Sequence, residues 1–282
     1  MTPPVRLGAV SYLNARPLVF GLETSPECVV RFDVPSQCAE LLHGGAIDVG
    51  LIPSIEYLRP RVRTEPYAIV PDLAIASNGP VASVAIFTTR PMADVRSIAL
   101  DTSSRTSVAL LRVLCARVFG INPALEHWAP DLDAMLGQCD AALIIGDKAL
   151  IQDSGEVQVV VSGFSRTSGD MIAVEKIDLG EVWTRTTGLP FVWAFWAGRS
   201  GCMSPAQVGA LQLARDRGLQ CTDEIARTYF KDAPERQPIG ARYLRDNIKY
   251  SLGGDEQAGL KLFFQYAAEA GVVDHANSLR FY

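Results

Sequence analysis

Histidine is scarce in this chain of 282 residues, with only His43, His127 and His275 present. The three positions lie far apart in the sequence, which argues against a three-histidine metal site. The six cysteines show no short paired spacing, and this argues against both a zinc site and a disulfide framework. We therefore expect no bound metal, and reduced cysteines of the kind found in cytosolic proteins.

Basic residues are not in excess either. The sequence has 26 Lys and Arg against 31 Asp and Glu, a net charge of −5, whereas binding a phosphate backbone requires a basic face. No apolar run reaches the roughly 20 residues of a membrane span, and the first residues lack the pattern of a secretory signal. These absences predict a cytoplasmic protein with no nucleic-acid or membrane partner; they leave its oligomeric state unspecified.

The length and apolar content predict two lobes. Apolar residues make up 48% of the sequence, which is enough for packed cores, and 282 residues is long for a single core. A change of composition after Thr89 and a return strand near Trp196 suggest that one lobe is inserted into the other. We expect residues 1–89 and 197–282 to form the first lobe and residues 90–196 the second.

The stretch Ser97–Leu114 predicts a strand, a tight polar turn and a helix with one apolar face. The turn offers hydroxyl groups that can cap the helix, and the free backbone N–H groups of a first helical turn favour an anion. An arginine can add a two-pronged hydrogen bond to a carboxylate. The alternative is an ordinary helix cap with surface hydroxyls. The residues concerned are Thr102, Ser103, Ser104, Arg105 and Thr106.

A second group of polar residues follows the strand predicted at Arg6–Val10, where Pro17 can begin the next helix. In open α/β sheets, ligands bind outside the carboxyl ends of the strands. Ser11, Asn14 and Arg16 are therefore candidates for ligand contacts. The alternative for Asn14 is that it only caps the helix.

Further candidates stand at the ends of other predicted strands. Ser54 follows an apolar strand and can cap a helix, and Ser83 alternates with apolar neighbours so that it can face a cleft. Gly146 allows a ligand to approach the backbone, and Asp147 is expected to fix its loop rather than transfer protons. Trp193 can wall a cleft or pack a hinge.

The C-terminal part of the chain predicts helices, among them Ala241–Tyr250, which should complete the first lobe. Polar strand-to-helix turns from two such lobes, facing one cleft, are typical of the α/β periplasmic-binding-protein-like (type II) fold. Such clefts suit small anions.

Six segments, in this order, resemble the chorismate dehydratase family of the futalosine route to menaquinone. They are VSYLNARPL at 10–18, DVGLIPS at 48–54, NGPVASV at 78–84, ALDTSSRTSVALLR at 99–112, DAALIIGDKAL at 140–150 and DLGEVWTRTTGLPFVWAFW at 178–196. The resemblance covers about the first 200 residues, and the C-terminal helices match only in character.

The resemblance implies a hydro-lyase that removes water from the dicarboxylate chorismate to give 3-[(1-carboxyvinyl)oxy]benzoate, without a metal or organic cofactor. The matching segments contain no His, Lys or Glu placed as an obvious general base. Our hypothesis is that the enolpyruvyl carboxylate of the substrate takes the proton while Asn14 and Ser83 hold the ring substituents. The other residues named above would bind the substrate.

Two alternatives remain at this stage. A sister enzyme of the same pathway acts on dehypoxanthine futalosine and resembles a family that uses a cleft histidine, whereas the three histidines here lie outside the matching segments. The other alternative is a cytosolic protein that binds a small anion without catalysis.

Overall fold

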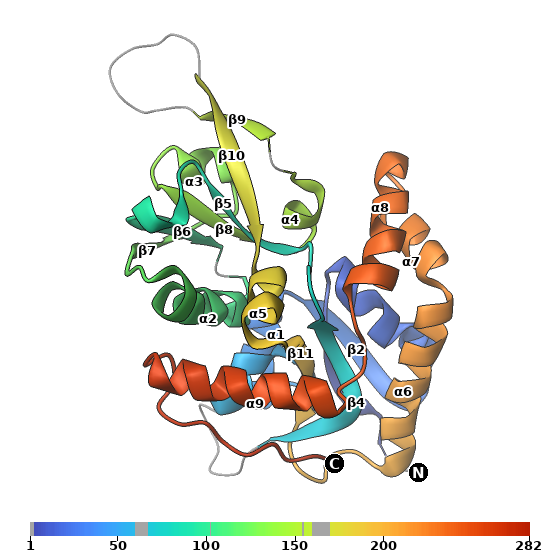
Figure 1. The fold of residues 1–282 in the computed structure, drawn as a ribbon. Helices are drawn as coiled ribbons and strands as arrows, with labels where there is room; N and C mark the ends of the chain where they lie inside the picture. Colours follow the sequence, from blue (N-terminus) through green and yellow to red (C-terminus); the bar gives the residue numbers. More distant parts are fainter. Residues whose placement is uncertain (1–2, 60–66, 102, 154, 160–169) are drawn as a thin grey trace.

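The computed structural model describes residues 3–59, 67–101, 103–153, 155–159 and 170–282. Within these residues the chain forms two mixed β-sheets flanked by helices (Figure 1). The strands are β1 Val5–Val10, β2 Cys28–Asp33, β3 Val49–Pro53, β4 Ala68–Ser77, β5 Val84–Thr88, β6 Ser97–Asp101, β7 Ala124–Trp128, β8 Ala141–Ile145, β9 Gly155–Val159, β10 Asp170–Asp178 and β11 Phe191–Gly198. The helices are α1 Pro35–His43, α2 Arg105–Leu114, α3 Leu132–Leu136, α4 Asp147–Ile151, α5 Leu179–Thr187, α6 Pro205–Gln220, α7 Thr222–Tyr229, α8 Gln237–Arg242 and α9 Gly254–Glu269.

The two sheets define two lobes of related topology. The first lobe has the strand order β2-β1-β3-β11-β4 and the second β7-β6-β8-β5-β10-β9. In each lobe three parallel strands, β2-β1-β3 or β7-β6-β8, are followed by an antiparallel strand, β11 or β5. Strands such as β3 and β8 are buried along their whole length, as expected for apolar runs covered on both faces.

The boundaries between the lobes differ from those expected at residues 90 and 196. Strand β5, expected in the first lobe, pairs with β8 and β10 of the second sheet. Strand β11, expected mostly in the second lobe, pairs with β3 and β4 of the first sheet. The chain therefore crosses between β4 and β5, and again between β10 and β11, because each strand joins the sheet where its backbone groups find partners.

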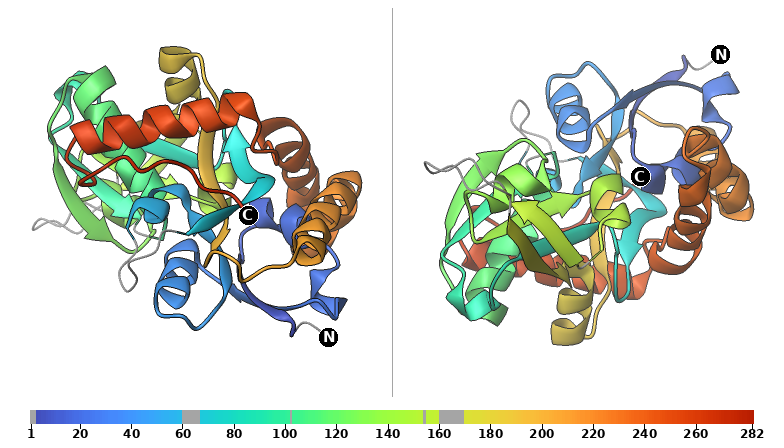
Figure 2. Two further views of the ribbon diagram at one scale, coloured as in Figure 1. Left: turned by 90° about the horizontal axis from the view of Figure 1, so that it is seen from below. Right: turned by 90° about the horizontal axis from the view of Figure 1, so that it is seen from above.

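The helices around the two sheets are seen from three sides in Figures 1 and 2. Helices α3 and α4 lie beside the second sheet, and α6, α7 and α8 lie together at the opposite side of the molecule, beside the first sheet. Helix α9 contacts both α2 of the second lobe and β11 of the first. The C-terminal helices thus help to hold the two lobes together.

The helix expected at Ala241–Tyr250 is shorter than predicted. Helix α8 ends at Arg242, the chain continues as one wide π-helical turn over Tyr243–Asn247, and Ile248 is extended. The backbone of Lys249 then pairs with Ala76 of β4, with both N–H to O distances at 2.8 Å. These two hydrogen bonds to the sheet replace those of a continued helix.

Candidate functional site

A narrow cavity lies between the two lobes, where the carboxyl ends of parallel strands meet. Its walls are mostly apolar, with a few polar groups, as is usual for small-molecule sites. The described residues that line it are Val10, Tyr12, Asn14, Pro35, Pro53, Ile75, Val81, Ser83, Val84, Ser104, Ser107, Ile145, Gly146, Trp193 and Ala194. Asp, Glu, His and Lys are absent from this described lining.

Asn14 lies in the 3₁₀ turn Leu13–Val19 that follows β1. Its Oδ1 atom is buried without a hydrogen-bond partner. An unpaired buried acceptor costs free energy, on the order of 1–3 kcal/mol, and this atom is available to accept a hydrogen bond. Pro17 stands inside the same turn and not at its start, because the turn already begins at Leu13; the expectation that Pro17 begins the helix was therefore wrong.

Ser83 precedes β5 and is held in a tightly fixed turn. The Asp178 carboxylate accepts backbone N–H groups of Val81 at 3.0 Å and Ala82 at 2.6 Å. Ala82 has φ 63°, a left-handed conformation that costs a non-glycine residue on the order of 1 kcal/mol. Burial raises the pKa of Asp178, although its backbone hydrogen bonds oppose this. Backbone strain of this kind, held here by a half-buried carboxylate, is a feature found at functional sites.

The second lobe contributes the N-terminus of α2. Ser104 is the N-cap, and its side chain accepts from the Ser107 backbone N–H at 3.4 Å and from the Ser107 hydroxyl at 3.0 Å. Both serines line the cavity. The helix dipole and the free N–H groups of this first turn favour a carboxylate. Thr102, another candidate cap, lies outside the described residues.

Gly146 and Trp193 complete the predicted residues in the lining. Gly146 has φ 68°, and a Cβ atom at this position would lie 3.4 Å from the Tyr12 ring. The Trp193 indole N–H donates to the Ser77 hydroxyl at 3.1 Å, and its ring packs against Phe191 with 4.4 Å between ring centroids. Trp193 is therefore both a cavity wall and part of the packing.

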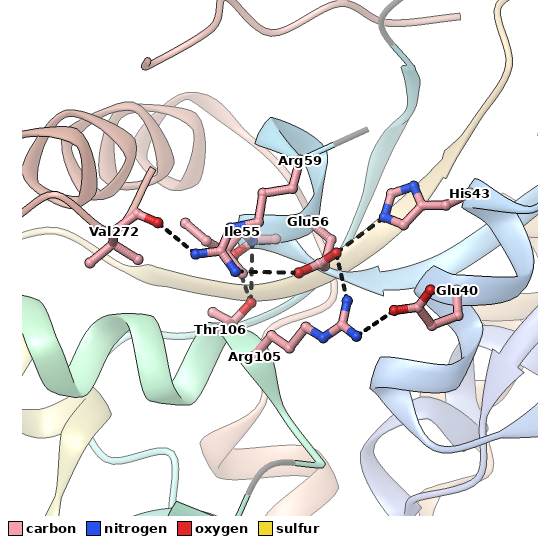
Figure 3. Close-up of polar contacts among 9 residues, drawn as sticks. Glu40, His43, Ile55, Glu56, Arg59, Arg105, Thr106 and Val272 are labelled. Carbon is pink, nitrogen blue, oxygen red and sulfur yellow. Dashed lines mark hydrogen bonds and ion pairs between the residues drawn. The ribbon is translucent and has the colours of Figure 1, made fainter. Parts of the chain in front are cut away.

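Arg105 and Thr106 lie outside this lining and connect the lobes (Figure 3). Arg105 donates to Glu40 at 2.6 Å and to Glu56 at 3.0 Å. Burial alone would raise the pKa of Glu56, but His43 and Arg105 outweigh it and the pKa lies below its usual value. The expectation of an arginine facing the ligand overlooked these two acidic partners from the first lobe.

Hydroxyl groups near Arg105 are engaged in the same contact between lobes. The Thr106 hydroxyl accepts the Ile55 backbone N–H at 3.3 Å and lies 3.4 Å from the Ser54 hydroxyl. Ser54 and Thr106 are fully buried. Ser103 accepts from the Tyr12 hydroxyl at 3.1 Å and donates to Asp101 at 2.6 Å. These three side chains fasten the lobes rather than line the cavity.

Ser11, Arg16 and Asp147 also lie beside the cavity instead of in its lining. The Arg16 guanidinium donates to the Ser11 backbone oxygen at 3.2 Å and lies over the Phe32 ring at 4.6 Å. The Asp147 carboxylate accepts a hydrogen bond from the Tyr229 hydroxyl of α7. Burial raises the pKa of Asp147. The hydrogen bond from Tyr229 ties the start of α4 in the second lobe to α7 of the first lobe.

The structure adds polar residues that the sequence analysis did not select. Tyr12 and Ser107 line the cavity, and both stand next to chosen residues: Tyr12 within the segment SYLNARP, and Ser107 three positions after the cap. The local sequence pattern was therefore sufficient to select these two residues as well. Tyr243 contacts Ser83 from the C-terminal part of the chain, and no local pattern indicates this.

The described residues offer neither a metal cluster nor a membrane-spanning helix. They contain no group of three or more His, Cys, Asp or Glu side chains that could hold a metal ion. Nor does any helix in the described part of the chain have the length and apolarity to cross a bilayer. All six cysteines are free thiols.

Solved structures with this fold include several binding proteins. A protein of Archaeoglobus fulgidus matches with a TM-score of 0.70 and 14% identity, covering 96% of this chain and 99% of that one. The alkanesulfonate-binding protein of Xanthomonas axonopodis pv. citri, bound to MOPS, matches with a TM-score of 0.62 and 16% identity, covering 96% and 94%. These likenesses confirm the expected periplasmic-binding-protein-like fold.

Sequence comparison identifies the family. A family model described as menaquinone biosynthesis matches residues 5–269. A protein of Thermus thermophilus named chorismate dehydratase is 32% identical over 264 residues, covering 92% of this chain and 94% of its own. The resemblance seen in the six sequence segments is thereby confirmed, and the chain belongs to the menaquinone biosynthesis family.

Proposed function

We propose that this protein is a chorismate dehydratase, a hydro-lyase that converts chorismate to 3-[(1-carboxyvinyl)oxy]benzoate. One structural observation carries the proposal: Asn14, Ser83 and the start of α2, with Ser104 and Ser107, come from three separate parts of the chain and line one cavity between the lobes. The relative named chorismate dehydratase supports the choice of substrate. The free cysteines support placing the reaction in the cytoplasm.

The cavity offers donors for one substrate carboxylate at the start of α2. The ring carboxylate of chorismate is conjugated to the C3 position, so negative charge that forms as the C3 proton leaves spreads toward that carboxylate. The Ser104 hydroxyl, whose own proton is left free because it accepts from Ser107, and the positive end of the helix dipole stabilise such charge. This interaction is stronger in the transition state than in the bound substrate, and it therefore accelerates the reaction.

The elimination itself needs a base and a path for the leaving oxygen. In our proposal the C3–H bond breaks, the enolpyruvyl carboxylate of the substrate takes the proton, and the electron pair forms the third ring double bond. The C4–O bond breaks, and the departing hydroxide takes that same proton from the substrate carboxyl group and leaves as water, which regenerates the carboxylate. Asn14 orients the C4 hydroxyl and Ser83 donates to the enolpyruvyl side chain. The absence of Asp, Glu, His and Lys from the described lining supports a base supplied by the substrate.

Aromatisation makes this reaction strongly favourable, so orientation is the main requirement on the protein. Positioning of reacting groups can account for several kcal/mol of a barrier. Polar groups fixed by Asp178 on one side and by the N-cap of α2 on the other suit that task.

The positions of the histidines argue against the sister enzyme that acts on dehypoxanthine futalosine. His43 is buried between Tyr67 and Glu56, at 2.9 and 3.1 Å from their oxygens. His127 and His275 are exposed. The cavity lining among the described residues thus contains none of the three.

Incubation of the purified protein with chorismate, followed by mass spectrometry, tests the proposal. We expect the aromatic product to accumulate with loss of one water. Chorismate binding without product would instead favour a non-catalytic anion-binding protein. If neither binding nor product were found, the sister enzyme would become the better candidate.

A further inference from the structure

Tyr243 joins the C-terminal part of the chain to the residues around the cavity. It is the first residue of the π-helical turn Tyr243–Asn247, and only 2% of it is exposed. Its hydroxyl donates a hydrogen bond of 2.7 Å to the Ser83 hydroxyl oxygen. Ser83 lines the cavity, whereas Tyr243 lies behind it.

This hydrogen bond restricts the orientation of the Ser83 proton. A serine hydroxyl has one proton and two acceptor lone pairs. Because Tyr243 donates to one lone pair, the Ser83 proton has to point elsewhere, and the cavity is the open direction. Ser83 is thereby preset as a donor toward a bound molecule.

The Tyr243 hydroxyl stays protonated at neutral pH. Burial raises the pKa of the Tyr243 phenol far above its ordinary value, and hydrogen bonding with Ser83 only partly opposes this. The phenol therefore keeps its proton at neutral pH and remains a donor.

We propose that Tyr243 is a positioning residue that presets Ser83 as a hydrogen-bond donor for the dehydration of chorismate. The proposal rests on the proposed function, because it assigns Tyr243 to that reaction. Tyr243 acts through Ser83 and has no contact with the substrate. A preset donor needs no reorganisation as charge develops, which lowers the barrier to the reaction.

The substitution Tyr243→Phe tests this directly, because it removes the hydroxyl and keeps the ring that packs in the core. We expect kcat for chorismate to fall about tenfold or more, with a smaller change in KM, because the lost orientation matters most in the transition state. Tyr250→Phe is the matched control. Tyr250 is equally buried and follows the same turn, but its hydroxyl has no hydrogen-bond partner, so kcat should stay near the wild-type value.

A double variant shows whether Tyr243 acts through Ser83. If it does, Ser83→Ala combined with Tyr243→Phe should turn over at the rate of Ser83→Ala alone. Because this pair removes both hydroxyls, neither is left unsatisfied, and the comparison remains decisive if Tyr243→Phe alone fails to fold. Melting temperatures of all variants show whether a fall in kcat reflects a loss of folding.

Three results would count against these assignments in different ways. A wild-type protein that makes no aromatic product would overturn the proposed function and, with it, the role of Tyr243. A wild-type protein that is active, with Tyr243→Phe within twofold of its kcat, would overturn the positioning role alone. So would a double variant tenfold slower than Ser83→Ala.

Discussion

Asn14 of the first lobe and Ser104 of the second line the same cavity, although one follows β1 and the other precedes α2. Asn14 offers an unpartnered acceptor and Ser104 caps a helix whose first turn favours anions. An acceptor and an anion site facing one another suit a substrate with a hydroxyl group and carboxylates. This relationship between the lobes is the basis of the predictions below.

Replacement of Asn14 tests its role in turnover. Asn14→Ala and Asn14→Asp should both abolish detectable dehydration of chorismate, because one removes the acceptor and the other adds a charge facing the substrate carboxylates. The fold should remain intact, since Asn14 Oδ1 has no partner in the protein. Rates and melting temperatures should be compared with those of Asn277→Ala, an exposed asparagine. Near-normal turnover by Asn14→Ala would exclude this role.

Two glycines with positive φ separate a cavity effect from a backbone effect. Gly146→Ala and Gly188→Ala both place alanine at φ near 70°, and each should lose on the order of 1 kcal/mol of stability. Only the Cβ atom at Gly146 meets Tyr12, at 3.4 Å; that at Gly188 has open space. We expect a raised KM for chorismate in Gly146→Ala alone. Equal KM values in the two variants would contradict a ligand close to Gly146.

The ion pairs of Arg105 should contribute strongly to stability. Arg105→Ala leaves the fully buried Glu56 carboxylate without one of its cations, and breaking such a buried pair costs about 3 kcal/mol or more. Arg31→Ala breaks a pair whose arginine side chain is 59% exposed, for which we expect less than about 1 kcal/mol. Urea unfolding of the two variants measures the difference. Similar losses would show that the contact between lobes is as weak as a surface pair.

Asp48 should make stability depend on acid pH. Hydrogen bonding with Arg6 lowers the pKa of Asp48 from 3.8 to about 2, so below pH 4 the unfolded chain binds this proton more readily than the folded protein does. Stability from this group is therefore present above pH 4 and is lost as the pH falls toward 2.

The variant Asp48→Asn isolates that contribution. Wild type should be more stable than the variant at pH 6 by up to about 2 kcal/mol, reduced by solvent screening. The difference should shrink as the pH falls from 4 to 2, which urea unfolding at several pH values can follow. A difference independent of pH would contradict the assignment.

Local sequence signals were sufficient for part of the site and insufficient for the rest. Ser104 was predictable because a strand, a polar turn and an apolar helical face follow one another within a few residues. Arg105 was expected to face a ligand because its partners Glu40 and Glu56 belong to the other lobe. The approach of these two carboxylates to Arg105 depends on how the lobes pack against each other, and it cannot be predicted from spacing along the chain.

The assignment of strands to lobes was likewise only partly predictable from the sequence. The two-lobe architecture followed from alternating strands and helices, but strands β5 and β11 were assigned to the wrong lobes. Both are buried apolar strands, and such a strand can pair in either sheet. The hydrogen bond between Tyr243 and Ser83 also depends on where the chain crosses between the lobes, because Ser83 lies at that crossing, immediately before β5.

A crystal structure of the Asn14→Ala variant with chorismate tests the central claim most directly, because the slowed reaction should leave the substrate intact. We predict chorismate in the cavity between the lobes, with one carboxylate at Ser104 and Ser107 and its enolpyruvyl group near Ser83. Chorismate in the more open cavity lined by Asp131, Asp147 and Lys148, with the first cavity empty, would contradict the account.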